Sequence, residues 1–147
     1  MSYLLDTCVL SEALRPEPDR GVQEFLDTRD PGELFLSVLT LGELWKGVCK
    51  LATGRKRTRL MEWVESELPA EFQGRILAVD SAVAVGWGEL QARGESRGLP
   101  LPVIDSLLAS TALRSSLTVV TRNTRHFAQS GASVLNPWVQ AQSSGTS

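Results

Sequence analysis

The chain begins with the stretch Tyr3-Leu4-Leu5-Asp6-Thr7, in which a short apolar run ends on a carboxylate. Such a run is typical of a buried strand that stops at Asp6. A helix is expected to follow from Asp6 to Leu14, because the prolines of Arg15-Pro16-Glu17-Pro18 would stop it there. The first unit of the fold is therefore predicted to be a buried strand that leads directly into a helix.

The same alternation of strand and helix continues along the chain. Short apolar runs predict further strands over residues 34–38, 75–79, 117–121 and 133–135. Capping residues and helical spacing predict helices over residues 19–30, 40–52, 55–68, 81–97, 103–115 and 123–128. Thr40 would open one of these helices, and Pro69 would end another. Strands and helices in this order imply a three-layer α/β/α fold with a central, mostly parallel five-stranded sheet.

The composition is that of an ordinary globular domain. The 147 residues, of which 42% are hydrophobic and 22% charged, suit one domain at residues 2–138 and a polar tail at 139–147 that is predicted to be disordered. The net charge of −2 provides no overall basic field, which argues mildly against a nucleic-acid partner. The chain has no apolar run of about 18 residues and no signal-peptide pattern, so a cytoplasmic protein without membrane contact is expected.

Three carboxylates stand where strands or helices begin at one edge of the predicted sheet. Asp6 follows the first strand, and Glu43 lies one helical turn past the second. Asp105 lies in the first turn of an apolar helix that Pro102 would open. Each acid also has a structural explanation: Asp6 as a helix N-cap, Glu43 in a capping box with Thr40, and Asp105 as a partner of the helix dipole.

The three acids together are more specific than any one of them alone. Ligands of parallel α/β sheets collect outside the carboxyl ends of the strands, so the acids would converge there. A pocket of about three negative charges repels itself unless a divalent cation sits in it, and oxygen ligands favour Mg²⁺ or Mn²⁺. The matching chemistry is metal-assisted hydrolysis of a phosphodiester. The sequence therefore predicts a nuclease with Asp6, Glu43 and Asp105 as catalytic residues.

The end of the predicted fourth strand adds polar groups at the same edge. Thr121 and Asn123 are candidate auxiliary residues, although Asn123 is well explained as the cap of the short helix that follows. Arg122 and Arg125 are candidate contacts for phosphates, with solvated side chains as the alternative. His126, the only histidine, is either a general base or a surface residue.

Other residues that attract attention have ordinary structural interpretations. Cys8 and Cys49 lie in apolar surroundings, which favours reduced core residues over a disulfide, and too few ligands are present for structural zinc. The basic stretch from Arg55 to Arg59 is a solvated helix face or, in a nuclease, a surface that follows phosphates. The tryptophans are expected in the core or at a dimer contact: Trp45, Trp63, Trp87 and Trp138.

Four blocks of the sequence resemble the PIN-domain family, in its VapC toxin branch. They are Leu4 to Glu12, Leu39 to Leu44, Asp105 to Ala112 and Val119 to Phe127. The terminal Leu135-Asn136-Pro137-Trp138 is similar to the FitB-like members of that branch. The order and spacing of the blocks extend the resemblance over residues 2–138.

The resemblance implies a Rossmann-like fold and a Mg²⁺-dependent endoribonuclease, with Mn²⁺ as a substitute ion, that acts as the toxin of a type II toxin–antitoxin system. It implies Asp6, Glu43 and Asp105 as catalytic acids, of which Asp6 and Asp105 bind the metal. Thr7 and Ser11 match hydroxyl positions near the family's site. The implied partners are RNA, a second copy of the chain, and a small antitoxin encoded nearby, through which operator DNA would be bound.

The sequence departs from the family pattern after the fourth strand. Many members have an acid at the position of Asn123 or at that of His126, and neither residue is acidic here. The loss of that charge predicts a site with one ion rather than two. It also leaves an alternative function, in which the chain is a catalytically weak or inactive PIN-fold partner of a DNA-binding antitoxin in transcriptional autoregulation.

Overall fold

The computed structural model describes residues 1–139, and within them five parallel strands form one sheet. The order across the sheet is β3 (Ile76–Leu77), β2 (Leu34–Ser37), β1 (Tyr3–Leu5), β4 (Thr118–Val120) and β5 (Val134–Leu135). The predicted parallel sheet is confirmed, with strands shorter than expected. Because all strands run the same way, their carboxyl ends meet at one edge.

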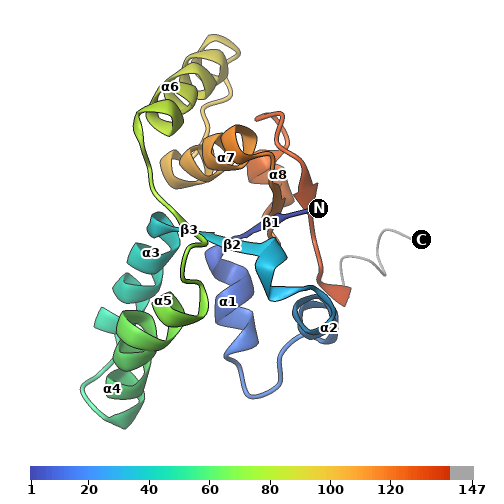
Figure 1. Cartoon of the computed structure of the whole chain (residues 1–147). Coiled ribbons are helices and arrows are strands. Elements are labelled where there is room, and N and C mark those ends of the chain that lie inside the picture. Colours follow the sequence, from blue (N-terminus) through green and yellow to red (C-terminus); the bar gives the residue numbers. More distant parts are fainter. Residues whose placement is uncertain (140–147) are drawn as a thin grey trace.

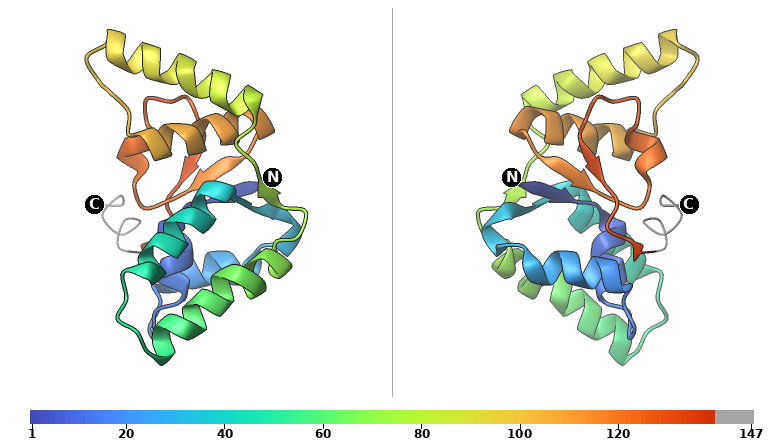
Figure 2. Two further views of the ribbon diagram at one scale, coloured as in Figure 1. Left: turned by 90° about the vertical axis from the view of Figure 1, so that its left-hand side faces the viewer. Right: turned by 90° about the vertical axis from the view of Figure 1, so that its right-hand side faces the viewer.

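Helices form a layer on each face of this sheet, as Figures 1 and 2 show. One layer contains α1 (Thr7–Ala13), α2 (Arg20–Thr28), α3 (Val38–Cys49), α4 (Arg55–Glu62) and α5 (Leu68–Glu71). The other contains α6 (Ser81–Ser96), α7 (Val103–Ser115) and α8 (Thr124–Phe127). A 3₁₀ turn, Pro31–Glu33, precedes β2. The predicted three-layer α/β/α architecture is confirmed.

The central strands separate two hydrophobic cores. Successive side chains of a strand point to opposite faces of the sheet. Tyr3 and Leu5 therefore pack with the α1–α5 layer, whereas Leu4 packs with the layer of α6, α7 and α8. Both Leu4 and Leu5 are fully buried. Coverage on both faces explains why β1 is apolar throughout and lacks the polar alternation of a half-exposed strand.

The start of α3 differs from the prediction. The helix begins at Val38 and is capped by Ser37, whose hydroxyl accepts the Leu39 N–H (3.0 Å). Thr40 lies inside the helix and is fully buried, and its hydroxyl has no hydrogen-bond partner among residues 1–139. The capping box between Thr40 and Glu43 is therefore wrong, because Thr40 is too far into the helix to cap it.

Pro69 was predicted to end a helix, but the helical path continues through it. The helical path runs from α4 through a π-helical segment, Trp63–Glu67, into α5. The Leu68 N–H donates to the Trp63 carbonyl five residues back, so the turn before the proline is wider than an α-helical turn. A wider turn accommodates Pro69, which has no N–H to donate and whose ring needs space in the preceding turn.

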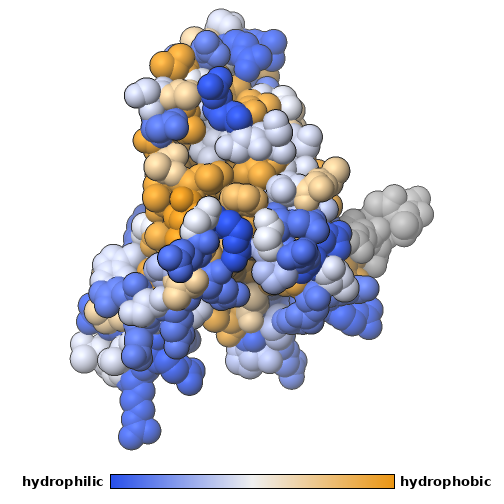
Figure 3. All heavy atoms as spheres, in the orientation of Figure 1, coloured by the Kyte–Doolittle hydropathy of each residue, from blue (hydrophilic) through white to orange (hydrophobic). Residues whose placement is uncertain are grey.

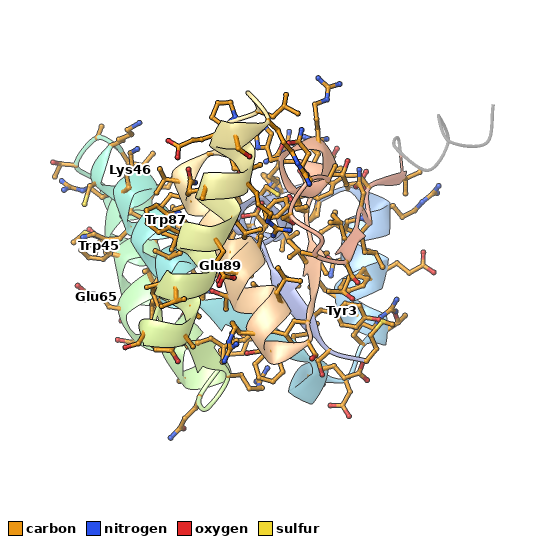
Figure 4. All side chains as sticks on the ribbon, turned by 90° about the horizontal axis from the view of Figure 1, so that it is seen from above. Tyr3, Trp45, Lys46, Glu65, Trp87 and Glu89 are labelled. Carbon is orange, nitrogen blue, oxygen red and sulfur yellow. The ribbon has the colours of Figure 1, made fainter. Side chains whose placement is uncertain are left out.

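Cysteines and tryptophans follow the predictions only in part. Both cysteines are free in the described part of the chain, but Cys49 is exposed near the end of α3 and is not a core residue. Trp138 is buried, and Trp45 and Trp63 pack against the core on the α1–α5 side. Figure 4 shows Trp45 on the opposite side of the molecule from Tyr3.

Two further expectations concern the ends of the chain and its surroundings. The polar tail predicted at residues 139–147 falls, from residue 140 onward, outside the described residues. Over residues 1–139, no helix has both the length and the apolar character needed to cross a membrane.

Candidate functional site

Asp6 is a buried carboxylate at the carboxyl end of the central strand. Its Oδ1 accepts the Thr7 N–H (2.8 Å) and its Oδ2 accepts the Thr121 hydroxyl (2.7 Å). The Asp6 N–H donates to the Val120 carbonyl (3.0 Å), which ties the residue to β4 as well. Asp6 is only 5% exposed. It does cap α1, as the structural explanation held, but a cap does not require this degree of burial.

Burial and a neighbouring charge both act on the Asp6 carboxylate. Burial raises the pKa of Asp6, hydrogen bonds from Thr121 and Thr7 lower it, and the charge of Asp105 raises it again, with a net shift upward. The two acids are therefore close enough for their charges to interact, although 99 positions separate them in the sequence. Like charges held together in this way favour the binding of a cation.

Asp105 lies in the first turn of α7, as predicted. Its side chain is 17% exposed, and its Oδ2 lies 2.7 Å from His126 Nδ1. His126 belongs to α8, so the contact joins two helices of the same layer. Pro102 stands at the N-cap of α7 and not at its first helical position, which is a small correction.

The hydrogen-bond donor to Glu43 lies in α1 and not in its own helix, α3. The Thr7 hydroxyl donates to Glu43 Oε1 (2.5 Å), and Glu43 is partly buried. This hydrogen bond, and not a capping box with Thr40, accounts for the position of the Glu43 carboxylate. Thr7 thus contacts both acids, through its N–H to Asp6 and through its hydroxyl to Glu43.

The described contacts link the three predicted acids in pairs rather than as one close group. Within residues 1–139, no group of three or more His, Cys, Asp or Glu side chains is arranged to hold a metal ion. The structure instead brings Asp6 near Asp105, and links Glu43 to that pair through Thr7. Glu43 itself belongs to α3, and Thr7 of α1 is the residue that connects it to Asp6.

Thr121 and Cys8 complete the surroundings of Asp6. Thr121 is fully buried and, besides its bond to Asp6, accepts the Asn123 N–H (3.0 Å). Cys8 Sγ lies 3.7 Å from Asp6 Oδ2 and 3.6 Å from Thr121 Oγ1. Burial raises the pKa of the Cys8 thiol, and the charge of Asp6 raises it further. Sequence reasoning missed Cys8, although its position two residues after Asp6 was an available signal.

The remaining predicted residues lie in different surroundings. Asn123 stands at the N-cap position of α8, as the structural explanation held, but its side chain makes no capping hydrogen bond. The Arg122 guanidinium lies 4.8 Å above the Trp138 ring, and Arg125 is exposed. Ser11 is exposed on α1 and faces a groove beside Glu43.

This groove, of about 720 Å³, lies between α1, α3, α4 and the π-helical segment. Thr7, Ser11 and Glu43 are among its lining residues, and Arg15, Lys56 and Arg59 add positive charge. Leu60 and Trp63 contribute apolar surface. Figure 3 shows that α4 forms a hydrophilic projection at one end of the molecule. Two residues of the predicted basic stretch therefore line a groove that reaches the candidate site.

Comparison with known proteins finds relatives that are named as toxins or ribonucleases. The PIN domain family model matches residues 3–131. The toxin FitB of Neisseria gonorrhoeae is 38% identical over 92% of this chain and 97% of its own, and the VapC ribonuclease Y4jK of Sinorhizobium fredii is 33% identical over 94% and 99%. A structure described as FitAB bound to the IR36 DNA fragment superposes with a TM-score of 0.87 at 37% identity, covering 92% of this chain and 95% of that one.

Proposed function

We propose a nuclease function on the premise that this chain belongs to the PIN-domain family, in the branch of FitB and the VapC toxins. Its function is that of a Mg²⁺-dependent endoribonuclease, the toxin of a type II toxin–antitoxin system. One observation carries the proposal: Asp6 is buried at the carboxyl edge of the sheet with the charge of Asp105 beside it. A buried carboxylate next to a second one is costly unless a cation compensates for the charge.

The chemistry of these side chains fits Mg²⁺. Asp6 and Asp105 offer carboxylate oxygens, the ligands that Mg²⁺ prefers, and one or two carboxylates with several waters are its usual protein environment. Asp6 and Asp105 would hold the ion, and Mn²⁺ would bind in its place. Only Asp6 and Asp105 are proposed as ligands, since Glu43 is bonded to Thr7. The proposal is therefore for one ion.

When bound, Mg²⁺ supplies a Lewis acid that activates water and offsets negative charge on the phosphate. Thr7 holds Glu43 by Oε1, so Oε2 is the atom that would accept a proton from the attacking water. Lys56 and Arg59 would bind phosphates of the RNA along the groove. Burial of Asp6 excludes water from its side of the site, and the Thr7 and Thr121 donors keep the carboxylate in one orientation.

The proposed partner is a small antitoxin that joins the toxin to operator DNA. The FitAB structure is described as a complex bound to DNA, and this chain resembles it over nearly its whole length. The net charge of −2 supports indirect contact, because the chain itself has no overall basic field to bind a duplex. Self-association into a dimer and a cytoplasmic location remain predictions.

The test of the nuclease function is RNA cleavage by the purified chain. Cleavage is expected with Mg²⁺ or Mn²⁺, and a chelator should abolish it. Asp6→Asn should lower the rate by roughly a thousandfold, since a bound metal contributes several kcal/mol to the transition state. Glu24→Gln, an exposed change on α2, is the matched control and should leave the rate unchanged. Activity that survives both chelator and Asp6→Asn would exclude the proposed site.

A second candidate function is supported by the neutral residues Asn123 and His126, which stand where many family members have an acid. In it, the chain binds its antitoxin and DNA but cleaves RNA weakly or not at all. Expression of the chain without antitoxin distinguishes the two functions. Growth arrest that requires Asp6 supports the ribonuclease, whereas normal growth together with tight antitoxin binding supports the second candidate.

A further inference from the structure

One short segment after β4 contacts both acids of the proposed metal pair. At its start, the Thr121 hydroxyl donates to Asp6 Oδ2 (2.7 Å), and at its end His126 Nδ1 lies 2.7 Å from Asp105 Oδ2. The segment is also bonded to itself. The Asn123 N–H donates to Thr121 Oγ1 (3.0 Å), and the His126 N–H donates to the Asn123 carbonyl (3.0 Å).

The segment is anchored to the core immediately after His126. Phe127 is fully buried in the core on the α6–α8 side. The Ser130 hydroxyl donates to the Phe127 carbonyl (2.7 Å) and thereby closes the turn that follows. With its neighbour fixed in this way, the His126 backbone cannot move away from α7 without exposing the Phe127 ring. His126 is nevertheless 47% exposed, so burial alone does not explain its contact with Asp105.

The direction of the hydrogen bond follows from the chemistry of the two groups. An ionised carboxylate only accepts hydrogen bonds, so Nδ1 must carry the proton that is donated to Asp105. Oδ2 is then engaged, and Oδ1 is the oxygen left for an ion. With its Nδ1–H donated to Asp105, His126 acts on the carboxylate through a hydrogen bond.

We propose that His126 is a positioning residue that orients Asp105 for metal binding by donating its Nδ1–H to Oδ2. The inference rests on the proposed function, since it concerns the same metal pair. Partners that orient ligands in this way typically change metal affinity about 10- to 100-fold when they are removed. Thr121 gives Asp6 the same support, so residues 121–126 act on both acids together.

The first measurement is Mn²⁺ affinity, by calorimetry on the full chain without an affinity tag. His126→Leu should bind Mn²⁺ about tenfold more weakly than wild type. His126→Asn should recover most of that loss, because its side-chain nitrogen is as many bonds from the backbone as Nδ1 and still donates. Gln129→Ala, an exposed change close by, is the control and should bind as wild type does.

The second measurement separates positioning from a general loss of structure. RNA cleavage by His126→Leu should return toward the wild-type rate at saturating Mn²⁺, whereas cleavage by Asp6→Asn should not. Because His126 is the only histidine, nitrogen-15 NMR of its ring gives unambiguous signals. The Nδ1–H signal should be present in wild type and shift in Asp105→Asn.

Outcomes against the inference are distinct from outcomes against the nuclease function. If His126→Leu binds Mn²⁺ as tightly as wild type, while Asp6→Asn does not bind it, His126 has no positioning role and the proposed metal pair stands. A Nδ1–H signal that Asp105→Asn leaves unchanged also overturns the inference. If wild type binds no Mn²⁺ at all, the metal site and the role of His126 are both refuted.

Discussion

Asp6 and Glu43 are carboxylates at the same edge of the sheet, but the structure surrounds them differently. Asp6 is buried, and both of its oxygens accept hydrogen bonds from neighbouring segments. Glu43 lines an open groove, and one hydroxyl from Thr7 is its only hydrogen-bond donor among residues 1–139. In the proposed function, the Asp6 side would hold the ion and the Glu43 side would meet water and RNA.

Glu43→Gln should separate the two sides most clearly. Gln keeps an oxygen that can accept the Thr7 hydroxyl, but it cannot take a proton from water. Cleavage should fall about 100-fold or more, with little change in melting temperature or Mn²⁺ affinity. Glu67→Gln, at another acid of the same groove, should cleave nearly as wild type does. Loss of Mn²⁺ binding by Glu43→Gln would instead make Glu43 a ligand.

Thr121→Val should affect stability and metal binding together, because it acts on the buried side. The change removes the donor to Asp6 and leaves the Asn123 N–H without its acceptor. We expect a loss of about 1–3 kcal/mol in unfolding free energy and a 10- to 100-fold weaker affinity for Mn²⁺. Denaturant unfolding and calorimetry measure the two effects. Thr118→Val, in the strand β4 that directly precedes Thr121, is the control, and equal losses in both variants would contradict the prediction.

Lys56→Gln with Arg59→Gln should weaken substrate binding on the groove side only. The KM for RNA should rise several-fold while kcat stays the same, because in the proposed function these side chains would contact phosphates away from the reacting atoms. The slope of log affinity against log salt should become shallower by about 0.7 per removed charge. Arg97→Gln, exposed beyond the end of α6, is the control. A lower kcat with unchanged KM would place these residues at the chemistry instead.

The smallest expected effect is the pH dependence of stability that Asp6 causes. Burial raises its pKa in the folded state above the ordinary value of 3.8, so the folded chain holds the proton at pH values where the unfolded chain has lost it. This contribution is complete below 3.8 and is lost as the pH rises through the folded value. Without divalent ions, wild type should therefore lose melting temperature relative to Asp6→Asn as the pH rises from about 4 toward neutral.

Thermal unfolding of both proteins across that pH range checks the prediction. Addition of Mg²⁺ at pH 7 should raise the melting temperature of wild type and leave Asp6→Asn unchanged, because the proposed metal site exists only in the folded chain. The exposed variant Glu24→Gln should follow wild type at every pH. A difference between wild type and Asp6→Asn that stays constant with pH would show that the Asp6 charge is compensated in another way.

Local sequence signals predicted elements well where one physical cause dominates. The apolar run before Asp6 gave β1, and the residues from Val103 to Ser115 gave the bounds of α7 as the structure has them. Prediction failed where two local signals competed. At the start of α3, Ser37 and Thr40 are both good caps, and Ser37 caps the helix because β2 ends there. A proline usually ends a helix, but at Pro69 the preceding π-helical turn is wide enough to accommodate it.

The sequence by itself determined the parallel sheet and the position of Asp6 at the carboxyl end of β1, because short apolar runs that alternate with helices indicate both. It also identified Asp6, Glu43 and Asp105 as candidates. Only the tertiary structure decided how they are grouped, since contacts between distant segments depend on how helices pack over the sheet. Helix packing places Asp105 near Asp6 and brings Glu43 within hydrogen-bond distance of Thr7. It also joined His126 to Asp105, a pairing that no spacing in the sequence indicates.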